Sequence, residues 1–337
     1  MRQIEEQELE LEIEEKKEEG IIKSIISWIL LNTKFLLVPG YRLEELSHRE
    51  FEYEKTISKR KFIRRLKSTL TILGILIVFA IVTLAIFGEW LTPYTFEQAN
   101  GVDKTSASWA GPSPEHPLGT GKWGRDILAR LIYGARASLT IALPAISFSV
   151  ILGVIFGMIA GFYGGWIDSI IMRITDVFLA FPSLILALVF VSIWGQKMEI
   201  IMIAYGILGI PYYARLIRGS VLQARELPYI QAATASGSGN WRIMFKHVLP
   251  NIIQPIIISF TFDIGGIILS LAGLAFLGYS DINLVEWGND ISDSRDMVMI
   301  APHAMIWPGI MILITVLGFM LVGDGLRDAL DPRLRNL

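Results

Sequence analysis

The chain has 337 residues and a formal net charge of −2, and 53% of its residues are hydrophobic while only 18% are charged. An ordinary soluble domain is ~45–50% apolar and ~25% charged, and here the excess lies in several long uncharged blocks that one globular core cannot hide. Composition therefore excludes a soluble enzyme, a disordered chain and a nucleic-acid binder with a basic face, and the absence of cysteine excludes thiolate chemistry. It predicts an all-α membrane protein.

The first part of the chain, residues 1–66, is predicted to be a cytoplasmic N-terminal extension. Residues 1–20 hold nine Glu against three basic residues, which predicts a solvated acidic tail. Residues 21–38 are apolar but contain Lys23 and Lys34 on one helical side, which favours an interfacial helix over an additional span. The acidic N-terminus also argues against a signal peptide.

The rest of the chain, residues 67–337, is predicted to be a transmembrane domain. A span needs ~20 mostly apolar residues to cross ~30 Å of hydrocarbon, and six stretches meet this condition. The fourth is the weakest, because Pro211 interrupts it and Arg215 and Arg218 must reach the interface. The six predicted spans lie at about 68–88, 138–162, 170–196, 198–217, 248–280 and 297–323.

The distribution of Lys and Arg near span ends predicts the orientation, because cytoplasmic segments are enriched in them. Seven of these residues lie within 55–67, before the first span, and more follow the fourth span within 218–246. They predict a multi-pass plasma-membrane protein with both termini in the cytoplasm. Segment 91–137 should then lie outside although it carries five Lys or Arg, but long loops are a weaker guide to orientation.

The cytoplasmic segment 219–250 is too long for a simple connector. Pro228 suits the first position of a helix, small residues follow it, and Gly237 or Gly239 can end that helix. The pattern predicts a short exposed helix on the cytoplasmic face. A turn-rich amphipathic linker is the alternative.

This segment resembles the cytoplasmic loop of ABC importer permeases, whose pattern is Glu-Ala-Ala, a Gly four positions later, and a Leu-Pro pair. Gln231 stands here in place of the family's Glu, which puts any salt bridge of that Glu in doubt. The residues that fit the spacing are Gln231, Ala232, Ala233, Gly237, His247, Leu249 and Pro250. Other blocks are similar to the C-type permease of dipeptide and oligopeptide importers, at 116–139, 161–184, 275–280, 285–288, 301–309 and 322–335.

The resemblance implies the type I ABC importer permease fold and a machine of two permeases, two ATPases and an external substrate-binding protein. This chain would pair with a B-type permease in the lipid bilayer, and its loop would be a coupling helix that docks on an ATPase. It would bind no cofactor, because ATP and Mg²⁺ belong to the ATPases. The expected cargo is di- or oligopeptides, with oligosaccharides or nickel as alternatives, and a secondary transporter or channel is the rival class.

Charged residues within the spans provide further candidates. Asp263, near the middle of the fifth span, should avoid lipid, because exposure there costs at least ~2.5 kcal/mol. A role on the translocation path and a paired or capping structural role both stay open. Arg173 and Asp176 are three residues apart and share a helix face, which favours a pair. The predicted structural or interfacial charges are Asp168, Arg173, Asp176, Asp324 and Arg327.

Catalytic and metal-binding motifs are not found in the sequence. The stretch GTGKW at 119–123 lacks the glycine that a phosphate-binding loop needs five positions before its Gly-Lys pair, since His116 stands there, and Trp123 replaces the required Ser or Thr. The four histidines are scattered, so no zinc site is expected. An intramembrane enzyme is therefore disfavoured, because no catalytic set is visible.

Overall fold

The computed structural model describes residues 66, 68–101, 106–281 and 283–330. The chain divides into two units, residues 1–62 and 63–337, and all described residues belong to the second. The acidic tail and the interfacial helix expected at 21–38 therefore lie outside the described residues.

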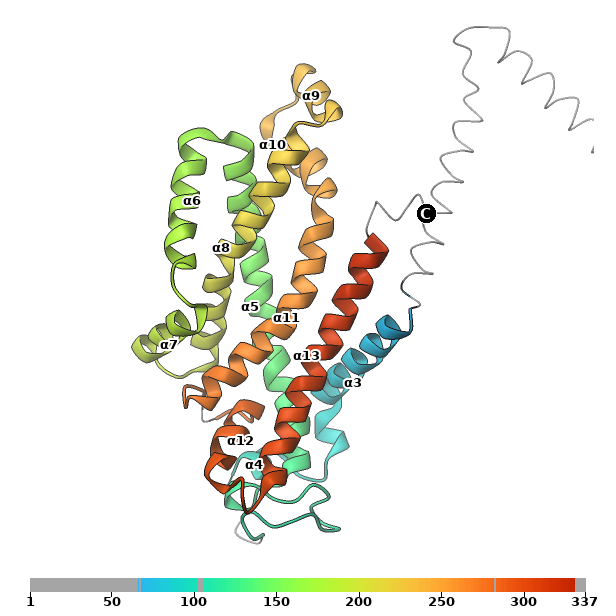
Figure 1. The fold of residues 1–337 in the computed structure, drawn as a ribbon, viewed down its shortest axis with the longest axis vertical. Helices are drawn as coiled ribbons and strands as arrows, with labels where there is room; N and C mark the ends of the chain where they lie inside the picture. The colour runs from blue at the N-terminus through green and yellow to red at the C-terminus, as the bar shows by residue number, and fades with distance from the viewer. Residues whose placement is uncertain (1–65, 67, 102–105, 282, 331–337) are drawn as a thin grey trace, which may run out of the picture. The chain divides into compact units, whose positions relative to one another are not determined.

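Five helices in the described part are long and apolar enough to span a membrane, and they run roughly along the long axis of the bundle in Figure 1. A bent pair of shorter helices supplies a sixth candidate span. No β-strand forms within the described ranges, which agrees with the predicted all-α class. The five long helices are α3 (Thr69–Leu91), α5 (Ile127–Tyr163), α8 (Met198–Arg225), α11 (Ile253–Phe276) and α13 (Pro302–Leu330).

The third predicted span is divided between two shorter helices. It consists of α6 (Gly165–Leu179) and α7 (Ser183–Trp194), which are bent by 85° relative to each other. The break falls at Pro182, whose ring disfavours helical backbone in the preceding residue and which has no N–H to continue the ladder. The predicted third span thus corresponds to a bent pair of apolar helices, and the bend itself was not predicted.

The fourth and second spans are longer than predicted. Helix α8 continues through Pro211, which is buried, as far as Arg225. Membrane helices tolerate an internal proline where neighbouring groups satisfy the freed backbone. Helix α5 begins at Ile127, because the Asp126 carboxylate accepts a hydrogen bond from Ala129 N and caps it. Its 37 residues span about 55 Å, so it extends beyond the hydrocarbon core.

Glycines govern the packing of α5 on α8. Gly153, Gly157 and Gly161 are spaced four apart on α5, and a methyl group on any of them would lie within 3 Å of an α8 atom. At Gly157 it would lie 2.6 Å from the Ala214 carbonyl oxygen and 2.7 Å from the Ile217 Cβ. Small residues at this spacing let membrane helices approach closely. The spacing of these glycines is visible in the sequence, but their packing partner on α8 is not.

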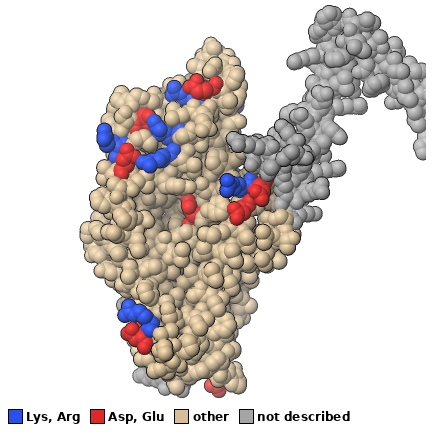
Figure 2. Space-filling view, viewed as in Figure 1, with Lys and Arg blue, Asp and Glu red and all other residues tan. Residues whose placement is uncertain are grey.

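Short helices gather at the two ends of the bundle (Figure 1). One end, here called the α9 end, holds α9 (Pro228–Ala235), α10 (Asn240–Arg242), a π-helical turn η2 (Ile243–Val248) and a 3-10 turn η3 (Leu249–Asn251). The opposite end, called the α12 end, holds α4 (Phe96–Asn100), η1 (Lys122–Gly124), α12 (Trp287–Ser294) and η4 (Arg295–Met297). Charged side chains on the face shown in Figure 2 form a few clusters on an otherwise uncharged surface.

Candidate coupling loop and charged sites

Helix α9 begins and ends where its sequence predicts. Pro228 occupies the first turn, where its missing N–H removes no hydrogen bond. At the other end Gly237 has a φ of +75°. The N–H of Ser238 donates to Ala233 O at 3.1 Å, and the N–H of Gly237 donates to Thr234 O at 3.0 Å. This pair of hydrogen bonds is a Schellman motif, which requires the left-handed backbone that glycine adopts readily.

Helix α9 projects from its end of the bundle (Figure 1). Ile230 is 2% exposed and anchors the helix in a hydrophobic cluster with residues of α5, α8 and η2. Gln231, Ala232 and Gly237 are exposed, and the Gln231 Nε2 donates to the Glu226 carbonyl oxygen at 3.2 Å. Beside the exposed Tyr229 and Gln231, the helix exposes small side chains such as Ala232 and Ala235, where its backbone is accessible to a partner.

The return segment holds the remaining three residues of the predicted loop, His247, Leu249 and Pro250. They lie in and after the π-helical turn η2, a rare geometry that often occurs at functional sites. Val248 is buried, while Pro250 is exposed. The structure thus brings all seven predicted loop residues to the α9 end, and their role in docking stays a prediction.

Two ion pairs join α6 to α8. Arg218 donates from Nε and Nη2 to the two oxygens of Asp168 at 2.6 and 2.7 Å, and Arg215 pairs with Asp176. The expected pair of Arg173 with Asp176 is wrong, because packing brings Arg215 to this carboxylate from the neighbouring helix. Arg173 is exposed and makes no ion pair with another described residue. A two-pronged arginine–carboxylate contact fixes direction as well as distance, so Asp168 orients α6 on α8.

Asp263 is half-buried near the middle of α11. The hydroxyl of Tyr213, a residue of α8 that is 1% exposed, donates to its Oδ2 at 2.6 Å. Beside this pair the exposed Tyr212 stacks edge-on against Tyr213, and its hydroxyl lies 3.4 Å from the Ser259 Oγ. The hydrogen bond to Tyr213 supports the structural role that the sequence left open for Asp263. Asp263, Tyr213, Tyr212 and Ser259, here called the polar strip, also reach the surface through Tyr212. The place of the polar strip on a translocation path stays a prediction.

The last two predicted interfacial charges, Asp324 and Arg327, are exposed near the end of α13. Neither forms an ion pair with another residue that the structure describes. Their anchoring role stays a prediction.

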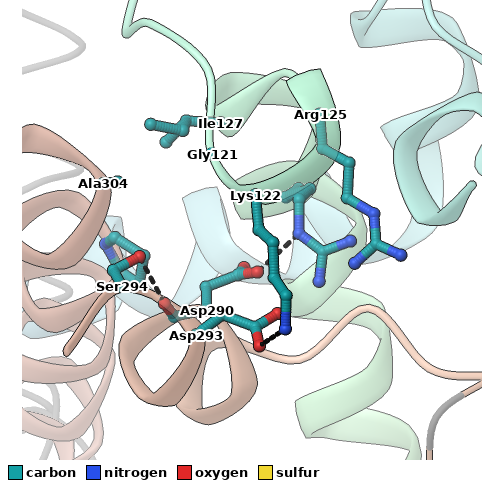
Figure 3. Close-up of a pocket in the computed structure, with 10 residues that line it drawn as sticks. Gly121, Lys122, Arg125, Ile127, Asp290, Asp293, Ser294 and Ala304 are labelled. Carbon is teal, nitrogen blue, oxygen red and sulfur yellow. Dashed lines mark hydrogen bonds and ion pairs between the residues drawn. The ribbon is translucent and has the colours of Figure 1, made fainter. Parts of the chain in front are cut away.

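The α12 end contains a partly buried charge cluster that the sequence did not suggest. Arg130 pairs with Asp290 at 2.5 Å, and Lys122 reaches Asp293 at 2.7 Å, as Figure 3 shows for Lys122. They line a cavity of about 10 Å³, enough for about one water molecule. Arg125 also lines it; burial, followed by the charge of Arg130, lowers the pKa of Arg125 to about 10, so it stays charged at neutral pH. These pairs tie α12 to the start of α5 through Arg130 and to the turn η1 before it through Lys122.

A second buried network holds His116 against the start of α5. The His116 Nδ1 lies 3.0 Å from the Asp126 Oδ2, and the His116 Nε2 lies 2.9 Å from the Ser106 Oγ. This order of groups is that of a hydrolase triad. His116 is only 7% exposed, however, and the other oxygen of Asp126 caps α5 at 2.6 Å. The network therefore serves to fix the loop on the helix.

Glu286, directly before α12, is 4% exposed. Burial, with a smaller contribution from Asp290, raises its pKa from 4.5 to about 8. The folded state therefore holds this proton more tightly than the unfolded state does, and the resulting stabilisation is complete below pH 4.5 and disappears as pH rises through 8. We expect the free energy of unfolding to fall by up to ~1.4 kcal/mol per pH unit within this window.

Thermal unfolding of the purified chain between pH 5 and 8.5 checks this expectation. Glu286→Gln removes the titrating group and should flatten the slope and raise the melting temperature at pH 8.5. Glu199→Gln, at an exposed site in the first turn of α8, should leave the slope as in wild type. Equal slopes for Glu286→Gln and wild type would contradict the assignment.

Comparison with known proteins agrees with this architecture of membrane-spanning helices, an exposed loop helix and a charged opposite end. The profile of the binding-protein-dependent transport system inner membrane component matches residues 153–336. The chain is 42% identical over 289 residues to the dipeptide transport system permease protein DppC of Alkalihalophilus pseudofirmus, covering 85% of this chain and 94% of that protein. It is 39% identical over 279 residues to the glutathione transport system permease protein GsiD of Pectobacterium atrosepticum, covering 82% and 92%.

These features define a polytopic transport permease. The chain belongs to the family of binding-protein-dependent transport system inner membrane components. As a member it is a permease subunit of an ABC transporter and not an enzyme, and ATP hydrolysis takes place on other chains. The resemblance drawn from the coupling-loop residues is thereby confirmed, together with the type I permease fold that it implied.

Proposed function

We propose that this permease forms half of the translocation path of an ATP-driven peptide importer, with α9 as the coupling helix that docks on an ATPase. The observation that carries the proposal is α9 itself, which projects from the bundle, is anchored through Ile230 and exposes small side chains. Docking of α9 in a groove of the ATPase requires that the two backbones come close, which depends on the shape of the helix more than on its charge. Docking is therefore expected to tolerate Gln231 in place of the family's Glu.

The partners in this proposal are a second, B-type permease, two ABC ATPases and an external substrate-binding protein. ATP and Mg²⁺ are expected on the ATPases, because the sequence of this chain contains no phosphate-binding loop. The chain itself is expected to bind no cofactor.

The α9 end is proposed to face the cytoplasm, and the α12 end the outside. Basic residues support this orientation: seven precede α3, and Arg242 and Lys246 are exposed at the α9 end. Both termini then lie in the cytoplasm, since six crossings return the chain to its starting side.

Peptides are the proposed cargo because two relatives are named for dipeptide and glutathione transport. The polar strip around Asp263 gives the path a carboxylate that can pair with the ammonium group of a peptide. We expect Asp263→Asn to lower peptide uptake about tenfold, equivalent to ~1.4 kcal/mol. Tyr213→Phe, which removes the hydroxyl but keeps the carboxylate, should stay within about twofold of wild type.

Uptake is measured in proteoliposomes that contain equal amounts of assembled complex. If both variants lose stability equally and neither changes uptake per folded complex, Asp263 has only the structural role.

The proposed machine is tested by affinity purification of the chain in mild detergent at native expression, followed by mass spectrometry. The expected result is recovery of two ATPase chains and a second permease, with ATPase activity that an external binding protein stimulates. Recovery of the chain alone, folded and stable, would contradict the importer and favour a secondary transporter or channel.

A further inference from the structure

The turn at residues 122–125 carries a residue that its backbone disfavours. Trp123 has φ 62° and ψ 27°, and Gly124 follows with φ 73°. Two successive positive φ angles define a type I′ turn, which favours Asn, Asp or Gly at its first central position. A bridge between Thr120 and Asp126 closes the base of the loop, so the chain cannot relax the turn without breaking that pairing. A bulky aromatic residue here is strained.

The strain at Trp123 is not offset by burial within this chain, since its side chain is 43% exposed. Two other tryptophans differ from Trp123 in this respect. Trp109 also has a positive φ, 64°, but its side chain packs against the main hydrophobic core. Trp287 is 1% exposed and donates its indole N–H to Leu131 O at 3.0 Å. Strain that persists at an exposed residue points to a function outside the fold.

Two cations lie against the Trp123 ring. The Lys122 Nζ lies 4.6 Å, and the Arg125 Cζ 4.3 Å, from the ring centroid. Each cation also has a second contact that fixes its position: Lys122 pairs with Asp293, and the Arg125 Nε donates to Gly101 O at 2.8 Å. Figure 3 shows the Lys122 and Arg125 side chains beside the two aspartates of α12. The aromatic ring is therefore held in place beside two positive charges.

The five charged groups at this turn sum to one positive charge. Lys122 pairs with Asp293 and Arg130 with Asp290, while the Arg125 Nε donates to the Gly101 carbonyl oxygen and its charge is not matched by a carboxylate of the described residues. A preorganised Trp with adjacent Arg has the composition of an interface hot spot, where Trp and Arg are enriched and a rigid anchor loses little entropy on binding. The positive charge selects a partner surface that carries carboxylates.

We propose that Lys122, Trp123 and Arg125, here called the Trp123 turn, dock the carboxylate-bearing surface of the external substrate-binding protein. The inference rests on the proposed function, which places the α12 end outside the membrane. The turn belongs to the loop segment between α4 and α5, which lies at the tip of this end in Figure 1, where a soluble partner has access. A displacement of the turn on binding would be transmitted to α12 through the Lys122–Asp293 and Arg130–Asp290 ion pairs.

Site-specific crosslinking in native membranes identifies the partner. A benzoylphenylalanine at position 123 of the intact complex should crosslink on irradiation to the binding protein, identified by mass spectrometry. The same probe at Trp90, which is 79% exposed near the end of α3, should not. Crosslinking from position 123 to the second permease, with none to the binding protein, would overturn the proposal and assign the turn to a contact between permeases.

Trp123→Asn separates docking from folding. Because Asn adopts the left-handed region readily, the melting temperature and the basal ATPase rate should equal or exceed those of wild type. The concentration of binding protein that gives half-maximal ATPase stimulation should rise about tenfold. The matched Trp90→Asn should leave that concentration unchanged.

An unchanged half-maximal concentration in Trp123→Asn, with a normal wild-type response, would overturn the docking site and leave the importer intact. A wild-type complex that no binding protein stimulates would overturn the proposed function and the docking site together.

Discussion

Gly237→Val is expected to abolish transport while leaving membrane insertion and abundance unchanged. Gly237 has a φ of +75°, and a side chain in this left-handed region costs roughly 1–2 kcal/mol, more for a β-branched residue. Valine would therefore unwind the Schellman motif that ends α9 and move the exposed face that we propose docks on the ATPase. We expect peptide uptake and substrate-stimulated ATPase activity to fall at least about tenfold.

Gly239→Val is the matched control in the same loop. Gly239 has φ −64° and ψ 145°, which valine adopts readily, and both positions have open space where a Cβ would lie. Gly237→Asn tests the cause, because Asn tolerates the left-handed backbone but adds bulk. Restored transport in Gly237→Asn would assign the defect to backbone conformation, and a persistent defect would assign it to the docking contact. Normal uptake in Gly237→Val would remove α9 as the coupling element.

Gly157→Leu is expected to prevent α5 from packing on α8. Even the first carbon of the new side chain would lie 2.6 Å from the backbone oxygen of Ala214, and backbone cannot yield as a flexible side chain can. Because the two helices pack along most of their length, we expect a destabilisation of roughly 3 kcal/mol or more and loss of folded protein.

The control for this change is Gly219→Leu, on α8 itself, where a Cβ would meet nothing within 4 Å. Both variants replace a helical glycine with leucine, so they share the same gain in helix propensity. The yield of monodisperse protein and its melting temperature in detergent provide the measurement. Equal stability of the two variants would show that the α5–α8 interface can separate without loss of the fold.

Hydropathy alone located the membrane-embedded parts of the chain. A stretch of about 20 uncharged residues can be buried only in lipid or in a large core, so its position follows from composition without knowledge of its neighbours. The same locality explains why α9 could be predicted, because Pro228 starts the helix and Gly237 ends it through contacts within a few residues.

Two prolines show where local reasoning fails. Pro211 was expected to weaken its span, yet α8 continues through it, whereas the chain bends by 85° near Pro182, where no break was predicted. Proline removes one N–H in both places, and whether the helix continues depends on the packing of neighbouring helices. The α5–α8 packing that buries Pro211 is a tertiary property.

The sequence by itself determined the class of protein, the number of membrane-embedded segments and the short loop helix, because each depends on composition or on contacts within one turn. Only the tertiary structure decided which charges pair. Asp176 finds Arg215 rather than Arg173, and Asp263 finds Tyr213, 50 residues away. The i,i+3 rule describes one helix, while a carboxylate beside a neighbouring helix pairs with the donor that packing brings to it.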